Sequence, residues 1–387
     1  MNDVRQAPTM ASPEARTAPQ TVGTGRVVTG AATAATEARA RGRSGAALIR
    51  PVALLAGLAV LLAASVVVAT AIGTVQLPYG ETARVVLAKA LGLPWALDAT
   101  YEAIVWNVRL PRVLAAGAVG LALAVCGAAM QGLFKNPLAS PDILGVSSGG
   151  ALGAVVGIFL GWPLVNPWLV PAAAFAGALV TLVIVYALAT RGGRTDMAAL
   201  LLAGVAVSSF AGAIIALLYH FVEDGVLRQI VYWLMGNLGG KRWEHLAVLT
   251  PLVAAGCVGL WLLSRELNLL MGGEDDARAL GVPVERTKRL VMVLASLATG
   301  AAVSVTGVIG FVGLIVPHIV RLLIGPDHRW LLPASGLLGA SFLILADLLA
   351  RTAFSPVELR TGIVTALAGV PFFLYLLAKR REMVRWG

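Results

Sequence analysis

The chain has 387 residues, of which 58% are hydrophobic and 13% are charged, and its mean hydropathy is +0.84. This balance excludes a soluble domain, because the polar groups are too few to cover a water-exposed surface. The formal net charge of +10 does not indicate nucleic-acid binding, since the basic residues are spread among short polar breaks and do not gather on one face.

The N-terminal region differs in composition from the rest of the chain. Residues 1–48 are rich in Ala, Thr, Gly and Arg and lack apolar periodicity, which predicts a disordered tail. The first apolar run, residues 51–74, follows a cluster of four arginines: Arg39, Arg41, Arg43 and Arg50. Such a cluster favours a cytoplasmic N-terminus. A cleaved signal peptide is the alternative, although the run is long for one. We expect a cytoplasmic tail at 1–48 and a transmembrane domain at 49–387.

A helix that crosses the hydrocarbon needs about 20 mostly apolar residues, and the sequence offers about ten such stretches. The first run is followed by an amphipathic outer segment at 76–107 and then by the remaining stretches: 111–133, 144–164, 168–189, 197–221, 245–263, 290–308, a short broken piece at 310–324, 331–350 and 362–377. The expected fold class is an all-α polytopic membrane protein. An even number of spans places both termini on one side, and the excess of Lys and Arg in the inner breaks makes that side the cytoplasm.

Two spans share a sequence pattern. LVPAAAFAGA at 169–178 and LLPASGLLGA at 331–340 have Leu, Pro, Ala and Gly-Ala at matching positions. The expected topology runs these spans in opposite directions, so the pattern indicates an inverted internal repeat, which is common in transporters. Chance similarity between two Ala-rich helices is the alternative.

The longest inner break, residues 264–289, has paired glycines and a proline around short polar helical stretches. It is too polar for lipid, so we interpret it as a docking surface for a soluble partner, with a plain solvated loop as the alternative. A second feature is a pair of prolines, Pro137 and Pro141, which forbid a continuing helix. The span that ends near residue 133 must therefore break there, either as a tight turn or as part of a gate.

Several kinds of chemistry are not supported. Cys126 and Cys257 each lie inside an apolar run, and the four histidines lack ligand spacing, so no metal site or cofactor is predicted. The chain has no GxxxxGK[ST] motif for binding ATP and no set of residues typical of a catalytic site. We therefore expect no enzyme activity, and any ATP hydrolysis must come from a separate subunit.

A series of short motifs, in order along nearly the whole chain from residue 51, resembles one family. These motifs include RLPR at 109–112, Gln131, NPLASPD at 136–142, YW at 232–233, Gly273-Glu274, ALG at 279–281, GFVGL at 310–314 and PFF at 371–373. The series is similar to the permease subunits of the ATP-binding cassette (ABC) importers for iron-siderophores, haem and vitamin B12, the FecCD-like family. One departure is Arg360, where relatives usually have proline.

The resemblance implies roles for three groups of residues. The resemblance assigns the docking of a binding protein to three arginines, Arg109, Arg112 and Arg351. Arginine suits this role because it pairs with carboxylates in a bidentate way. Coupling to the ATPase falls to the inner break: Gly273, Glu274, Ala279, Leu280 and Gly281. The pathway or its gate involves a third group: Gln131, Asn136, Pro137, Pro141, Asp196, Met197, Ser208 and Ser209.

Alternatives remain for these residues. The arginines could extend to lipid headgroups, and Asp347 and Arg351, spaced i and i+4, could form an internal ion pair. If the docking role holds, glutamate at the three arginine positions should weaken docking and leave folding intact. The small residues around Ser208 and Ser209 could serve helix packing instead of a pathway.

The resemblance implies a multi-pass permease in the bacterial cytoplasmic (inner) membrane. Its expected partners are a cytoplasmic ABC ATPase dimer, an extracytoplasmic substrate-binding protein, a second permease copy or paralogue, and membrane lipid. The sequence of residues 136–142 resembles that of ferric-siderophore permeases and favours such a cargo, and haem or cobalamin is the alternative. A secondary transporter driven by ions is a further alternative, which would need ionisable residues at mid-membrane.

Overall fold

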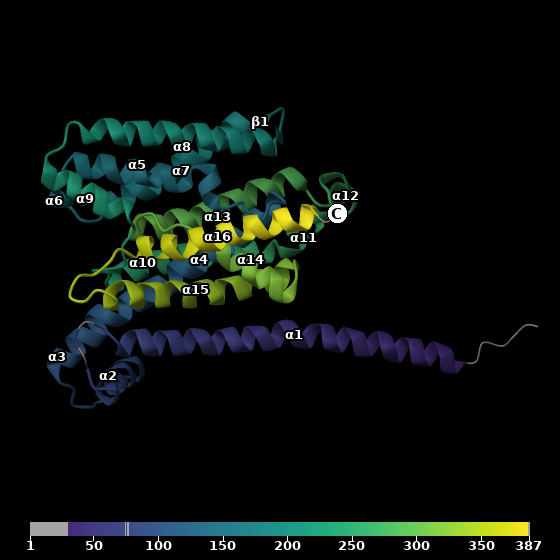
Figure 1. Cartoon of the computed structure of the whole chain (residues 1–387), viewed down its shortest axis with the longest axis horizontal. Helices are drawn as coiled ribbons and strands as arrows, with labels where there is room; N and C mark the ends of the chain where they lie inside the picture. Colours follow the sequence, from purple (N-terminus) through teal and green to yellow (C-terminus); the bar gives the residue numbers. More distant parts are fainter. Residues whose placement is uncertain (1–29, 74, 76, 386–387) are drawn as a thin grey trace, which may run out of the picture. The chain divides into compact units, whose positions relative to one another are not determined.

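The computed structural model describes residues 30–385 apart from residues 74 and 76. The ten apolar stretches all lie on helices, which confirms the all-α polytopic class (Figure 1): α1 (Gly30–Ala71), α4 (Leu110–Leu133), α5 (Val146–Phe159), α7 (Leu169–Ala189), α8 (Met197–Tyr219), α10 (Trp243–Leu262), α13 (Val284–Thr306), α14 (Val312–Ile324), α15 (His328–Thr352) and α16 (Thr361–Arg385). Seven helical segments of the described chain are long and apolar enough to cross a membrane, and α5, α14 and the first part of α16 are shorter apolar helices.

Shorter elements connect these helices. They are α2 (Tyr79–Leu91), α3 (Ala99–Glu102), the π-helical turn η1 (Ala103–Arg109), the 3-10 turn η2 (Pro141–Leu144), α6 (Trp162–Val165), β1 (Thr190–Arg191), β2 (Arg194–Thr195), α9 (Asp224–Leu234), α11 (Ser264–Gly272) and α12 (Glu274–Ala279). The β-hairpin and α9 were not expected from the sequence. The amphipathic segment at 76–107 contains α2, α3 and most of η1, and it continues directly into α4.

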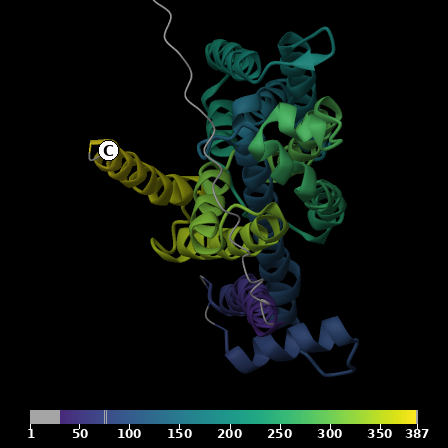
Figure 2. The same cartoon turned by 90° about the vertical axis from the view of Figure 1, so that its right-hand side faces the viewer.

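The helix α4 lies at the centre of the packing and contacts α10, α13, α14 and α15. Glycines permit this close approach. A Cβ at Gly120 would lie 2.2 Å from the carbonyl oxygen of Gly339, and one at Gly127 would lie 2.0 Å from that of Gly313. Small residues that let helix backbones approach are the usual basis of packing between membrane helices. The short helix α5 packs on α7 in the same way, and α8 lies beside both (Figures 1 and 2).

Two compact units divide the chain, Met1–Ile49 and Arg50–Gly387. In the first unit α1 begins at Gly30, and residues 1–29 lie outside the described part. The expected tail at 1–48, its disorder and its cytoplasmic side therefore stay predictions. The inverted repeat also stays a prediction; its two segments lie in α7 and α15.

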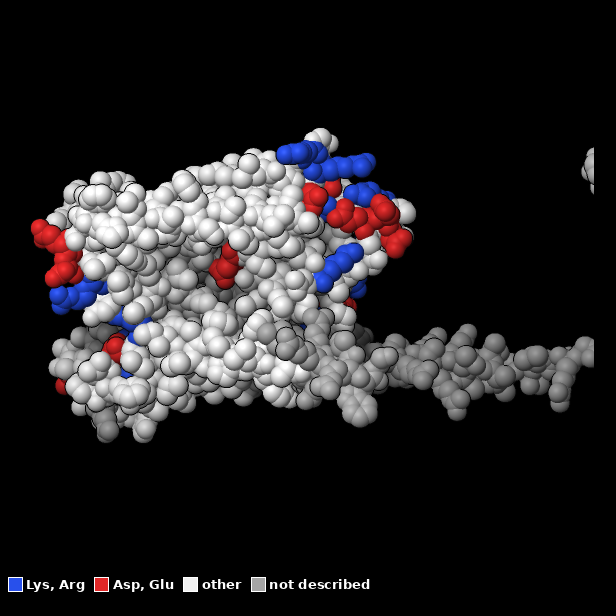
Figure 3. Space-filling model, turned by 45° about the horizontal axis from the view of Figure 1, so that its top comes forward, with Lys and Arg blue, Asp and Glu red and all other residues white. Residues whose placement is uncertain are grey.

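Charged side chains gather at the two ends of the helices (Figure 3). Between them the face in view is uncharged except for one isolated acidic patch. One end carries α11 and α12, together with the end of α4 and the start of α15. We call it the α12 end, and the opposite end, where α4 starts and α15 finishes, the α9 end.

Candidate functional site

At the α9 end, an ion-pair cluster surrounds Asp347. Arg112 binds this carboxylate with two parallel hydrogen bonds, Nε to Oδ2 at 2.9 Å and Nη2 to Oδ1 at 3.0 Å. Its remaining nitrogen, Nη1, donates to Oε2 of Glu358 at 2.9 Å, and the Thr361 hydroxyl donates to Asp347 at 2.9 Å. Such bidentate pairs of arginine and carboxylate fix geometry strongly. Glu358 is the exposed member, with 40% of its side chain accessible.

The other two predicted docking arginines also point inward. Arg109 donates to the backbone carbonyls of Thr70 at 3.2 Å and Ala71 at 2.8 Å, and to that of Val75. Arg351 donates to the carbonyl of Ala69, and its Nε lies 4.0 Å from Asp347, as in the ion pair considered from the sequence.

Arg109, Arg112 and Arg351 are only 5%, 7% and 4% exposed. The structure thus brings the three arginines to the same end of the helices and uses them for internal contacts. Glutamate at these positions should therefore harm folding, contrary to the expectation from the sequence. Their docking role stays a prediction.

At the α12 end, the predicted coupling residues form an exposed knob on a charged base. Ala279, Leu280 and Gly281 are exposed, and Leu280 is 64% accessible. Arg278 forms the base by pairing with Asp275 at 2.8 Å and with Glu274 at 2.9 Å. Leu280 thus ends the short, charged helix α12 with an exposed apolar side chain.

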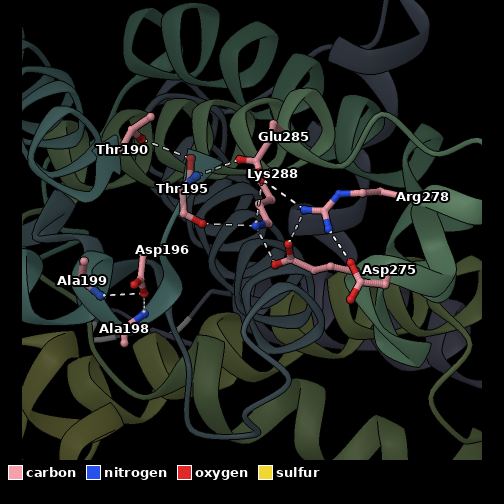
Figure 4. Close-up of polar contacts among 10 residues, drawn as sticks. Thr190, Thr195, Asp196, Ala198, Ala199, Asp275, Arg278, Glu285 and Lys288 are labelled. Atoms are coloured by element: carbon pink, nitrogen blue, oxygen red, sulfur yellow. Dashed lines mark hydrogen bonds and ion pairs between the residues drawn. The ribbon is translucent and has the colours of Figure 1, made fainter. Parts of the chain in front are cut away.

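Lys288 joins this base to the rest of the protein. Its side chain is 3% exposed, and its Nζ lies 2.6 Å from Glu274 and 3.3 Å from Glu285. It also donates to the backbone carbonyl of Thr195 at 3.2 Å, while the Thr195 amide donates to Glu285 at 2.9 Å (Figure 4). We call Lys288, Glu285, Glu274 and Thr195 the Lys288 clamp. A buried ammonium needs such a set of acceptors to offset its lost hydration.

The clamp holds a β-hairpin that leads into α8. Thr190 pairs with Thr195, and the turn is made by Gly192 and Gly193, both with positive φ (58° and 74°). Two central residues of positive φ are typical of a tight hairpin turn. Asp196 follows and caps α8, accepting from the amides of Ala198 at 2.7 Å and Ala199 at 3.2 Å. An open recess of about 670 Å³ lies between the hairpin and α12.

The residues assigned to the pathway or gate do not form one site. Gln131 is 2% exposed and ties α4 to α14, donating to the carbonyl of Gly313 at 3.2 Å and accepting from Arg321 at 2.7 Å. Asn136 and Pro137 form the turn after α4, where the Asn136 side chain accepts from the Leu138 amide at 2.9 Å.

The remaining members of that group lie on or beside α8. Pro141 begins η2, and Ser208 lies beside the glycine that follows η2. Ser209 is exposed, and Asp196 and Met197 lie at the start of α8, next to the clamp. The proline-rich break therefore exists as predicted, and its role in gating is untested.

Sequence reasoning missed Lys288, Glu285 and Thr195, and it assigned no role to Asp142. The spacing of Glu285 and Lys288, i and i+3 on one helix, was the available signal for the clamp. The pair Gly192-Gly193 between two threonines was the signal for the hairpin. Arg360, the departure from the family pattern, lies over the ring of Tyr232 with its Cζ 4.3 Å from the centroid, a cation–π contact.

Comparisons with known proteins bear on these features. Residues 60–379 match the model of the FecCD transport family. The chain is 50% identical over 295 residues to the cobalamin import system permease protein BtuC of Halobacterium salinarum, covering 76% of this chain and 78% of the relative. It is 46% identical over 284 residues to the hemin transport system permease protein HmuU of Yersinia pestis, covering 72% and 84%. A solved structure described as an inward-facing metal-chelate type ABC transporter matches with a TM-score of 0.74 and 34% identity, over 84% of this chain and 98% of that one.

Proposed function

Since the chain belongs to the FecCD transport family, as its motifs predicted, it is a multi-pass permease of an ABC importer, and we propose that it carries a metal chelate across the bacterial cytoplasmic membrane. The Lys288 clamp is the observation that supports a driven permease best. It connects Glu274, at the start of α12, to the hairpin before α8 through contacts of 2.6 to 3.3 Å, and the knob of Ala279, Leu280 and Gly281 lies at the other end of α12.

The mechanism follows from these contacts. A cytoplasmic ATPase dimer would seat the knob of α12 in a cleft, and its closure on ATP would displace α12. Because Glu274 of α12 and Thr195 of β2 share one buried ammonium, the hairpin and the start of α8 would move with α12. A rigid-body tilt of α8, with Asp196 and Met197 at its inner end, would then open or close the pathway. In this scheme the α12 end and both termini are cytoplasmic.

The α9 end would then face the binding protein. Arg112 is held by Asp347 and Glu358, and only Glu358 is substantially exposed. A carboxylate of the binding protein could replace Glu358 on Nη1 of Arg112 without disturbing the bidentate pair with Asp347. Docking by this exchange reconciles the buried arginines with their proposed role.

The proposal also concerns which chelate the permease carries. The motif at 136–142 favours a ferric siderophore, whereas relatives of 50% and 46% identity are named for cobalamin and hemin. We therefore propose a large metal chelate, with a ferric siderophore, haem and cobalamin as equally supported candidates.

The test is uptake into proteoliposomes that contain the permease together with its ATPase and its binding protein. Labelled ferric siderophores, haem and cobalamin are offered separately, with and without ATP. ATP-dependent uptake of one of them is expected, and an inactive ATPase variant should abolish it. Uptake that persists without the ATPase and collapses with an ionophore would contradict the importer, and uptake of cobalamin or haem alone would overturn only the siderophore assignment.

A further inference from the structure

Asp142 is a charged side chain at an unexpected depth. It lies in η2, the short turn between α4 and α5, and it is exposed on the surface of the chain. Two hydroxyls hold its carboxylate: Ser147 donates to Oδ1, and Ser140 donates to Oδ2 at 3.3 Å. Among the described residues, no basic side chain forms an ion pair with it.

Contacts with α8 fix the depth of this turn. A Cβ at Gly204 would lie 1.8 Å from the carbonyl oxygen of Ile143, and one at Gly145 would lie 3.2 Å from Oγ of Ser208. At about 1.5 Å per residue, Gly204 and Ser208 lie roughly 10 and 16 Å from the start of α8 at Met197. Because α8 has 23 residues, η2 reaches a level between a third and a half of the way along it. The following helix, α5, is correspondingly short, with 14 residues.

A carboxylate at this level cannot face lipid at an acceptable free energy. Charged groups inside a membrane occur where they meet water or a polar partner, and non-helical backbone at that depth is tolerated only where it lines a water-filled cavity or is covered by protein. Asp142 and η2 thus place an exposed carboxylate and irregular backbone together at this level, and a water-filled surface there would account for both. Ser209, the residue after Ser208 on α8, is exposed.

We propose that Asp142 lines the water-filled translocation pathway and presents its carboxylate to the cargo, so that the pathway favours chelates with cationic or hydrogen-bond-donating groups over anionic ones. This rests on the proposed function. Ser140 and Ser147 orient the carboxylate, and each of its oxygens keeps acceptor capacity for a donor from the cargo. Asp142 is thus a specificity-determining residue rather than part of the coupling mechanism.

The first experiment measures the charge of the pathway without any cargo. Ser209→Cys is introduced into the full-length permease in proteoliposomes, where the native Cys126 and Cys257 are buried. Its rates of modification by a cationic and an anionic methanethiosulfonate reagent are compared. The matched control is Val183→Cys on α7, an apolar position that is 65% exposed and two residues after the Thr181 that packs against Gly145.

We expect Ser209→Cys to react, and to react faster with the cationic reagent, while Val183→Cys stays nearly unreactive. Asp142→Asn should reduce the ratio of cationic to anionic rates by roughly tenfold, because a nearby fixed charge acts with opposite sign on the two reagents. Asp142→Glu should preserve the ratio, and unchanged thermal unfolding of both variants checks that the turn is intact. A Ser209→Cys that is as inert as the control, which is the result if lipid or a second copy covers this face, overturns the proposal, and so does a ratio that Asp142→Asn leaves unchanged.

The second experiment measures selectivity in the reconstituted importer. Asp142→Asn should raise the ratio of ATP-driven uptake of an anionic chelate to that of a cationic one by several-fold, while the ATPase rate stays the same. The labelling result does not depend on ATP-driven uptake, so failure of the importer assignment and failure of the role of Asp142 can be told apart.

Discussion

Lys288 donates a hydrogen bond to the backbone carbonyl of Thr195 at 3.2 Å, although the two residues are 93 positions apart in the chain. The same ammonium lies 2.6 Å from Glu274 of α12. One buried charge therefore joins the helix proposed to meet the ATPase and the strand that leads into α8. A displacement of α12 that leaves β2 behind would have to separate this ammonium from one of its acceptors.

The first prediction concerns this charge. Lys288→Met keeps most of the apolar stem and removes the ammonium, so it should lower ATP-driven uptake by at least about tenfold, within the usual range of coupling free energies. The basal ATPase rate of the assembled complex should remain, because no residue of the ATPase is changed. Uptake and ATPase rates are measured on the same proteoliposomes. Arg286→Met, an exposed position on the same helix, is the control, and equal uptake by the two variants would show that the clamp does not transmit motion.

The second prediction separates the two carboxylates bound to Arg112. Arg112→Gln leaves Asp347, whose side chain is 2% exposed, without its bidentate partner, and it should lower the free energy of unfolding by about 3 kcal/mol. Glu358→Gln, at a side chain that is 40% exposed, should cost less than about 1 kcal/mol. Denaturant unfolding of the purified permease in detergent measures both. Arg112→Lys retains the charge without the planar fork and should fall between them; equal stability of the Gln variants would contradict a structural role for the buried pair.

Some of these relationships could be predicted from the sequence. The membrane-spanning stretches could be predicted, because the ability of a helix to cross the hydrocarbon depends on the composition of contiguous residues. The hairpin turn at Gly192 and Gly193 was also within reach, since its signal is local.

The contacts of Lys288 with Glu274 and Thr195 and the inward direction of the arginines could not be predicted, because they join segments that are distant in the chain. Arg109 and Arg112 share a helix face, but the sequence does not tell whether that face meets Asp347 or solvent. The depth of Asp142 likewise depends on how η2 packs against Gly204, a contact between distant segments.

The third prediction concerns pH. Lys241 lies between α9 and α10, and burial lowers its pKa to about 8, whereas the unfolded chain has a value near 10.4. Burial therefore disfavours the charged form of the folded state at pH 7. As the pH rises from about 8 to about 10, the folded state releases this proton first, and the stability contribution of Lys241 should increase by about 1–3 kcal/mol. Lys241→Met should be more stable than the wild type at pH 7, and the difference should shrink towards pH 10. A difference that is independent of pH would contradict the lowered pKa; denaturant unfolding at both pH values measures it.

The last prediction concerns the packing of α4. A Cβ at Gly127 would lie 2.0 Å from the carbonyl oxygen of Gly313 and 2.6 Å from its Cα, and all of these are backbone atoms that cannot move aside as a side chain can. Gly127→Ala should therefore force α4 and α14 apart and destabilise the protein by about 1–3 kcal/mol. At Gly57 in α1, an added Cβ would meet no atom within 4 Å, so Gly57→Ala should be neutral or stabilising by up to about 1 kcal/mol through its higher helix propensity. Thermal unfolding in the same detergent compares the two. Gln131 of α4 also donates to the carbonyl of Gly313, so α4 and α14 meet closely at this glycine. Loss of stability in Gly127→Ala without loss in Gly57→Ala would show that the contact between α4 and α14, rather than helix propensity, fixes their separation.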